Sequence, residues 1–181
     1  PRVRIAFTNF DEPALGSGDY APVAGSAELG FQTTTTPTSG IDPLAAVAST
    51  GTTTTTPVLG HKSIAATTTL DAVDLTGWSD VVVSLMMQVR ATSYEAEDFL
   101  RIFVTDGISE LDLIALHGAA SDDPLDALAG DGYLAYSTAI PDDWTTATLV
   151  ISSSSNSSQG AERYDFDNIE FLGVLSTTTP G

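Results

Sequence analysis

The sequence predicts an all-β fold, a single antiparallel β-sandwich with about ten strands. Apolar and polar residues alternate with a period of two along most of the 181 residues. The alternating segments are short and are separated by turn-forming residues, as is typical of sandwiches. Helical patterns are confined to 42–48 and 122–130, where Asp precedes Pro, and we expect a turn or two of helix in each.

The first strands lie in the N-terminal part of the chain. The segment 2–10 places Val3, Ile5 and Phe7 on one face of a strand. Further strands are expected at 31–36, 50–58 and 61–70. Threonine runs fall within these strands, and threonine is β-branched, so we expect 33–36 and 52–56 to be strand-like. A flexible, O-glycosylated linker is the alternative interpretation of such runs.

The remaining strands follow in the second half of the chain. A long, mostly apolar run at 79–91 predicts a buried strand, and a break around Gly107 predicts a hairpin between the next two strands. The expected strands after the long one are 98–106, 110–118, 132–138, 145–153 and 163–173. We therefore predict a sandwich domain over 1–175 and a Thr-rich tail over 176–181, and we expect 174–181 to be held in place by a neighbouring molecule.

Composition limits the partners and the compartment. The chain has 24 acidic and six basic residues, and its formal net charge of −18 repels nucleic acid and anionic membranes. It has no stretch of the roughly 18–20 apolar residues that a membrane span requires, so no membrane insertion is expected. There is no cysteine for a disulfide or a cysteine-based metal site. Abundant Thr and Ser with a single Lys favour an extracellular or cell-surface location.

Four segments resemble a known family. They are "FTNFDEP" at 7–13, "LDAVDLTGWSDVVVSL" at 70–85, "DDWTTATLVI" at 142–151 and "YDFDNIEFLG" at 164–173. Together they resemble the landmarks of galactose-binding-like and carbohydrate-binding-module-like jelly-roll domains of secreted proteins. The resemblance extends from 3 to 173 and implies a jelly-roll arrangement of the strands.

The same resemblance implies a structural calcium that ties the first strand to the last. Asp11 and Glu12 match the acidic pair after the first strand, and Asp167 matches the aspartate of the final signature. Asp165 is two residues from Asp167 and shares its strand face. Calcium takes about six to eight oxygen ligands, which such residues supply. The alternative is a solvated strand face with Asn168 at a bulge.

Catalytic patterns are weak. Glu95 and Glu97 share a strand face, but they do not match the pattern of sandwich-fold glucanases, and a solvated loop is the preferred interpretation. His61 and His117 fit no metal or hydrolase motif, and we expect both at the surface or at strand ends. The Asp-rich loop at 121–132 is expected to be solvated, with a second metal site as the alternative. We therefore predict that the protein is not an enzyme.

Sugar binding requires exposed aromatic rings with polar groups nearby. Trp144, Tyr94 and Tyr133 are the candidates, although no clear aromatic platform emerges. Asn156 begins a glycosylation sequon, for which a plain polar turn is the alternative.

The sequence favours a non-catalytic extracellular structural or adhesive domain that self-associates into a homopolymer, such as the repeating subunit of a fibre or surface layer. The alternative is a carbohydrate-binding module of a secreted polysaccharide-active protein, whose partner is a polysaccharide.

Overall fold

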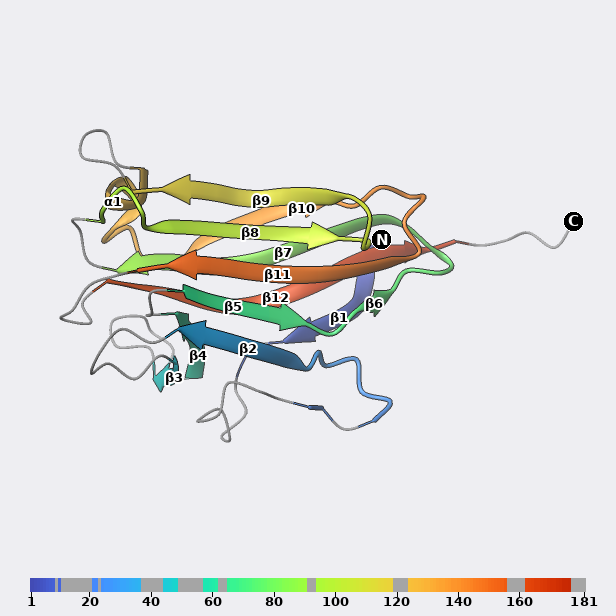
Figure 1. The fold of residues 1–181 in the computed structure, drawn as a ribbon. Coiled ribbons are helices and arrows are strands. Elements are labelled where there is room, and N and C mark those ends of the chain that lie inside the picture. The colour runs from blue at the N-terminus through green and yellow to red at the C-terminus, as the bar shows by residue number, and fades with distance from the viewer. Residues whose placement is uncertain are drawn as a thin grey trace, which may run out of the picture.

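The computed structural model describes residues 1–8, 10, 21–22, 24–36, 44–48, 57–61, 65–90, 94–118, 124–155 and 162–176. In this part of the chain, two antiparallel sheets of six strands each pack face to face as a jelly-roll-type sandwich (Figure 1). The chain passes repeatedly from one sheet to the other, so that strands distant in sequence become neighbours. The predicted all-β sandwich is confirmed.

The first sheet has the strand order β10-β7-β12-β4-β3, and β1 pairs with β12 as well. Strand β12 is central, because β7 pairs along one side of it while β4 and β1 pair in succession along the other. The strands of this sheet are β1 (Val3–Thr8), β3 (Leu44–Ala48), β4 (Pro57–His61), β7 (Trp78–Arg90), β10 (Leu134–Ala139) and β12 (Arg163–Leu175).

The second sheet has the order β2-β5-β11-β8-β9, with the short β6 beside β11. Its strands are β2 (Phe31–Thr36), β5 (Ala65–Leu70), β6 (Val73–Asp74), β8 (Phe99–Thr105), β9 (Glu110–His117) and β11 (Thr146–Ser154). The helix α1 (Pro124–Leu128) connects β9 to β10, and these two strands lie side by side where the sheets meet at one edge (Figure 1).

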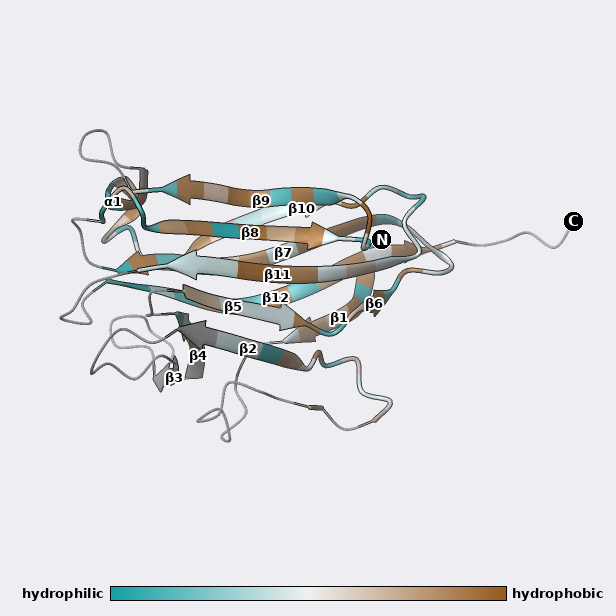
Figure 2. Ribbon diagram, viewed as in Figure 1, coloured by the Kyte–Doolittle hydropathy of each residue, from teal (hydrophilic) through white to brown (hydrophobic). Residues whose placement is uncertain are grey.

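The core fills the space between the sheets. Hydrophobic and hydrophilic residues alternate along the strands, as the bands of colour in Figure 2 show, so each strand turns one face inward. Val83 of β7, Ile102 of β8, Leu149 of β11 and Phe171 of β12 are completely buried. Burial of such side chains contributes roughly 1.5–3 kcal/mol each before the entropic cost of folding is counted.

The structure corrects one local prediction and confirms others. The segment expected to be helical at 42–48 forms β3, where Leu44 pairs with His61 of β4. Ladder hydrogen bonds outweigh the helical preference of its alanines, because propensity is a weak determinant beside tertiary pairing. The second predicted helix is confirmed as α1. The Thr run at 33–36 is confirmed as strand, whereas 52–56 lies outside the described residues.

Candidate functional site

Strand β12 contains a bulge at the polar residues that interrupt its apolar alternation. Between Asp167 and Glu170 the chain advances three residues, while β7 advances two, from Met86 to Ser84. Asn168 has a φ of +49°, a left-handed conformation that asparagine tolerates better than most residues. A carboxylate oxygen of Asp167 accepts a hydrogen bond from the Asn168 N–H at 2.8 Å. Asn168 thus lies within the bulge, and Asp167 borders it.

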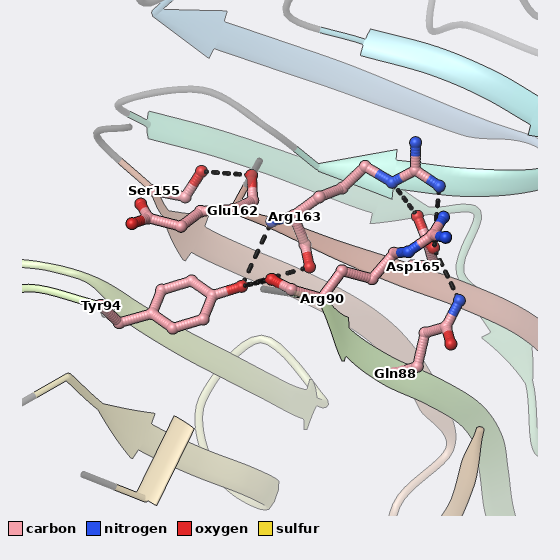
Figure 3. Close-up of polar contacts among 7 residues, drawn as sticks. All are labelled: Gln88, Arg90, Tyr94, Ser155, Glu162, Arg163 and Asp165. Atoms are coloured by element: carbon pink, nitrogen blue, oxygen red, sulfur yellow. Dashed lines mark hydrogen bonds and ion pairs between the residues drawn. The ribbon is translucent and has the colours of Figure 1, made fainter. Parts of the chain in front are cut away.

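Asp165 is the centre of an ionic network on the outer face of the first sheet (Figure 3). One oxygen lies 2.6 Å from Nε of Arg163, and the other accepts hydrogen bonds from Nη2 of Arg163 at 3.0 Å and from Nε2 of Gln88 at 2.8 Å. Nη1 of Arg90 lies 3.4 Å from the same second oxygen. Gln88 and Arg90 are the β7 partners of Asp165 and Arg163 in the ladder. The network therefore ties β7 to β12.

The predicted calcium ligands are only partly placed by this structure. Asp11 and Glu12 lie outside the described residues. Asp165 has both oxygens engaged by arginine and glutamine side chains, so it serves as a counter-ion. Asp167 is nearly buried beside the bulge. A calcium ion at this end of the sheet stays a prediction, with Asp167 as the described ligand that fits it best.

A second group of carboxylates, which the sequence did not indicate, combines Glu95, Asp98 and Glu162. One oxygen from each lies within 4.8 Å of the others, and Asp98 and Glu162 are buried while Glu95 is exposed. Asp98 closes the turn before β8 by accepting a hydrogen bond from the Glu95 N–H at 2.9 Å. Carboxylate oxygens gathered this closely are the ligands that a hard divalent cation prefers. The arrangement therefore suits a divalent cation.

The outer face of the second sheet presents an aromatic and charged cluster on β8 and β9. The guanidinium of Arg101 lies 4.1 Å from the centroid of the Phe103 ring. Arg101 also pairs with Glu110 at 2.7 Å and with Asp112 at 2.8 Å, both on β9. These contacts fix the direction of the guanidinium, since it is held by a ring on one side and by two carboxylates on another.

A hollow of about 260 Å³ lies beside this cluster. It is lined by Phe99, Leu100, Arg101, Ala115, Leu116 and His117. The rings of Phe99 and His117 are 6.3 Å apart with a tilt of 46°. Ala115 is the β9 partner of Arg101, and its single methyl group leaves space between the larger side chains. The hollow thus combines two planar rings, a guanidinium and an apolar lining.

Hydroxyl groups lead across the same sheet toward Arg101. Thr34 of β2 pairs with Thr67 of β5, which pairs with Ser152 of β11, which in turn pairs with Arg101 of β8. The neighbours that alternate with them, such as Thr68 and Ser153, are buried between the sheets. The row from Thr34 to Ser152 consequently faces outward beside the hollow.

The predicted sugar-binding aromatics lie in different environments. Trp144 is 8% exposed and Tyr94 is 3% exposed. Tyr94 stacks on Tyr164 with ring centroids 5.4 Å apart, and its hydroxyl contacts the backbone of Arg90 and Arg163 (Figure 3). Neither ring offers an open face to a sugar. Tyr133 is only partly buried, and burial together with the charge of Asp165 raises the pKa of its phenol.

Phe99, Phe103 and His117 were missed as candidate aromatics, although a signal was present for the two phenylalanines. Phe99 and Phe103 flank Arg101 at intervals of two, so the alternation of β8 places all three on one face. His117 lies beside Phe99 because β9 pairs with β8, and no spacing in the sequence predicts that pairing.

His61 is the last residue of β4, which agrees with the strand-end alternative, but its side chain is buried in the core and not at the surface. Its Nδ1 lies 2.8 Å from Oγ of Ser153, and its Nε2 lies 2.7 Å from Oγ1 of Thr68. Burial lowers the pKa of His61 to about 3, so the ring is neutral. Because His61 comes from the first sheet and both hydroxyls come from the second, this contact joins the two sheets. His117 is exposed, as expected.

Comparisons with known proteins give similarities of fold. No protein-family model matches the chain, and no relative was found among curated protein sequences. A xylan-binding module of Paenibacillus barcinonensis Xyn10C is 13% identical, with a TM-score of 0.48 and 97% of each chain covered. A Stig cyclase from a Fischerella species is 12% identical, with a TM-score of 0.49 and coverage of 97% of this chain and 100% of that one.

A further similar structure joins a carbohydrate-binding module to the catalytic module of Clostridium thermocellum xylanase 10B, in complex with xylohexaose. It is 11% identical, with a TM-score of 0.48, and the match covers 94% of this chain and 28% of the xylanase chain. The expected resemblance to carbohydrate-binding-module-like jelly rolls is thus found among solved structures. Similarities of this strength say nothing about what this chain binds.

The described part of the chain contains no helix with the length and apolar character needed to cross a bilayer.

Proposed function

We propose that this chain is a non-catalytic carbohydrate-binding module of a secreted protein, and that it binds a polysaccharide on the outer face of the second sheet. The observation that carries the proposal is the hollow between Phe99 and His117, with Arg101 at its side. Sugar rings have apolar C–H faces that pack on planar side chains, and hydroxyl edges that need hydrogen-bond partners. The rings meet the first need, and the guanidinium and the hydroxyl row meet the second.

The charge on this face favours a neutral polysaccharide. Arg101 is paired with two carboxylates, Glu110 and Asp112, so the cluster has a net negative charge. The whole chain is also strongly acidic, at −18, which disfavours polymers of uronic or sulfated sugars. A secreted setting agrees with this interpretation and with the composition.

Binding to a panel of soluble neutral polysaccharides, measured by affinity electrophoresis and calorimetry, tests the proposal. We expect Phe99→Ala and His117→Ala each to weaken binding by about tenfold, since the stacking of a ligand ring on a planar side chain is worth about 1–3 kcal/mol. Ile108→Ala is the matched control, because Ile108 is 93% exposed at the β8–β9 turn and outside the hollow. Absence of binding to the entire panel, or equal binding by all three variants, contradicts the proposal.

A self-assembling structural domain is the second candidate. The observation that favours it is β2, a Thr-rich strand at the end of its sheet that pairs with β5 alone among the described strands. A strand at the end of a sheet can pair with a strand of another chain. The dependence of the sedimentation coefficient on protein concentration distinguishes this candidate from a monomeric binding module.

Structural calcium is a further part of the proposal. Asp167, with Asp11 and Glu12, is the ligand set that the family resemblance implies, and the Glu95–Asp98–Glu162 group offers the alternative place. Both fit the preference of calcium for carboxylate oxygens. Calcium-dependent thermal stability, measured on variants of each set, is the test.

A further inference from the structure

A second hollow, of about 280 Å³, lies on the outer face of the first sheet, away from the proposed polysaccharide face. It is lined by Arg4, Phe7, Thr8, Asn168, Ile169 and Glu170. Strand β1 pairs with β12 here, with Thr8 opposite Ile169 and Phe7 opposite Glu170. The bulge in β12 is part of the hollow, because Asn168 is its extra residue and its side chain is exposed. Bulges often re-aim a side chain beside a functional site.

An ion pair between β1 and β12 forms one wall of this hollow. Nε and Nη2 of Arg4 lie 2.9 and 2.8 Å from the same oxygen of Glu170, Oε2. The guanidinium also lies 4.7 Å from the centroid of the Phe7 ring. Oε1 of Glu170 and the side-chain amide of Asn168 make no hydrogen bond to the described residues, whereas Oε2 of Glu170 and the Asn168 backbone N–H are engaged. The hollow thus presents a carboxylate acceptor, an amide and the remaining guanidinium donors together.

The charges of these groups restrict the ligand. An anion gains little, because Glu170 already neutralises Arg4 and the chain is −18 overall. A metal ion is disfavoured by the described lining, in which Glu170 is the only carboxylate and is already bound to a guanidinium. A purely apolar ligand would leave an amide and a carboxylate oxygen without partners. A neutral molecule with several hydroxyl groups satisfies all of them.

We propose that this hollow is a second ligand site, which binds one neutral pyranose unit through adjacent hydroxyl groups. One hydroxyl donates to Oε1 of Glu170 and accepts from Arg4, while its neighbour pairs with the amide of Asn168. The hollow is at the lower limit of small-molecule pockets, which span about 300–1,000 Å³, so it suits one ring rather than a chain. The class of ligand rests on the proposed function, whereas the site lies on the opposite sheet and can exist without it.

Nuclear magnetic resonance titration with the methyl pyranosides of glucose, galactose, mannose and xylose tests the site. We expect shifts of the Arg4 Nε–H and of the Asn168 backbone and side-chain amides. Asn168→Gly removes the amide and keeps the bulge, because glycine adopts positive φ without cost. Glu170→Gln removes the charged acceptor with little change of shape. Each variant should weaken binding by about tenfold, the effect of losing one hydrogen bond to a charged or buried partner.

Two control variants separate the outcomes. Arg2→Met breaks an exposed ion pair with Asp80 that borders neither hollow, and it should bind as the parent does. Phe99→Ala should weaken binding to the second sheet by about tenfold and leave the Arg4 and Asn168 shifts unchanged. The second site is refuted if none of the four glycosides shifts these resonances, or if Asn168→Gly and Glu170→Gln bind as tightly as Arg2→Met. Shifts near Phe99 and His117 alone would support the proposed function and refute the second site.

Discussion

Nε of Arg163 lies 2.6 Å from an oxygen of Asp165, and the two side chains share the outer face of β12. Asp165 is 0% exposed, although it is on the outer face of the sheet. Arg90, from β7, contacts the other oxygen of the same carboxylate. One buried negative charge therefore compensates two arginines across the central strand pair of the first sheet.

Asp165→Ala should destabilise the fold severely. Removal of the carboxylate takes away the charge that Arg90 and Arg163 share, and loss of one partner from a buried ion pair costs about 3–5 kcal/mol. Urea unfolding measures the change. Asp80→Ala is the matched control, because the Arg2–Asp80 pair is exposed and such pairs contribute about 0–1 kcal/mol. Similar losses for the two variants would show that the Asp165 network does not stabilise β7 against β12.

His61 should make stability depend on pH in the acid range. The folded-state pKa is lowered to about 3 from 6.5, so the unfolded chain takes up a proton on this group that the folded chain does not. The contribution of His61 is therefore fully present above pH 6.5 and is lost as the pH falls from 6.5 toward 3. Its slope approaches about 1.4 kcal/mol per pH unit in that window.

The contribution of His61 can be separated from that of the many carboxylates. His61→Gln keeps groups that can hydrogen-bond to Ser153 and Thr68 but does not titrate. Unfolding free energies of the parent and the variant, measured between pH 3 and 7, should approach each other as the pH falls. Parallel curves over that window would mean that the buried ring does not resist protonation.

Calcium should raise the melting temperature, and a chelator should lower it. A ligand that binds only the folded state stabilises it by about 2.7 kcal/mol at 100 times its dissociation constant. If the family-type site holds the ion, Asp167→Asn abolishes the response. If the second carboxylate group holds it, Glu162→Gln abolishes the response instead. If a chelator does not change the melting temperature of the parent protein, both proposed calcium sites are refuted.

The order and approximate bounds of the strands could be predicted because they depend on local pattern. Strand β8 was expected at 98–106 and is observed at Phe99–Thr105, and β12 was expected at 163–173 and is observed at Arg163–Leu175. The alternation of apolar and polar residues that predicts a strand can be recognised within a single segment of the sequence. The failure at β3 has the opposite cause, since its pairing with β4 is a tertiary contact that outweighs the local preference.

The sites could not be predicted to the same extent, because they depend on register. Asp165 looked like a metal ligand from its strand alone, and the sequence does not report that Gln88 and Arg90 lie across from Asp165 and Arg163. The Glu95–Asp98–Glu162 group likewise joins a turn before β8 to the start of β12. Phe99, Arg101 and Phe103 are different, since their spacing on one strand was sufficient to place them on one face.

The position of β2 at the end of the second sheet, among the described strands, gives a final prediction, which decides between the two candidate functions. If the domain polymerises by adding a segment of one copy to the β2 edge of the next, assembly is head-to-tail and propagates. Sedimentation velocity of the parent protein should then show species that grow with concentration. Thr34→Lys should keep the protein monomeric, because a lysine on an edge strand disfavours pairing with another chain. Deletion of 177–181 should do the same if the tail is the added segment.

The control for this experiment is a lysine on an interior strand of the same sheet. Thr148 of β11 is paired on β8 with Thr105 and is not at the edge, so Thr148→Lys adds the same charge without blocking an edge. Assembly that is lost in Thr34→Lys and kept in Thr148→Lys identifies β2 as the joining strand. A parent protein that stays monomeric at high concentration rules out the fibre subunit, because a head-to-tail contact that does not close into a ring adds further copies as the concentration rises. The carbohydrate-binding module is then the function that the exposed residues support.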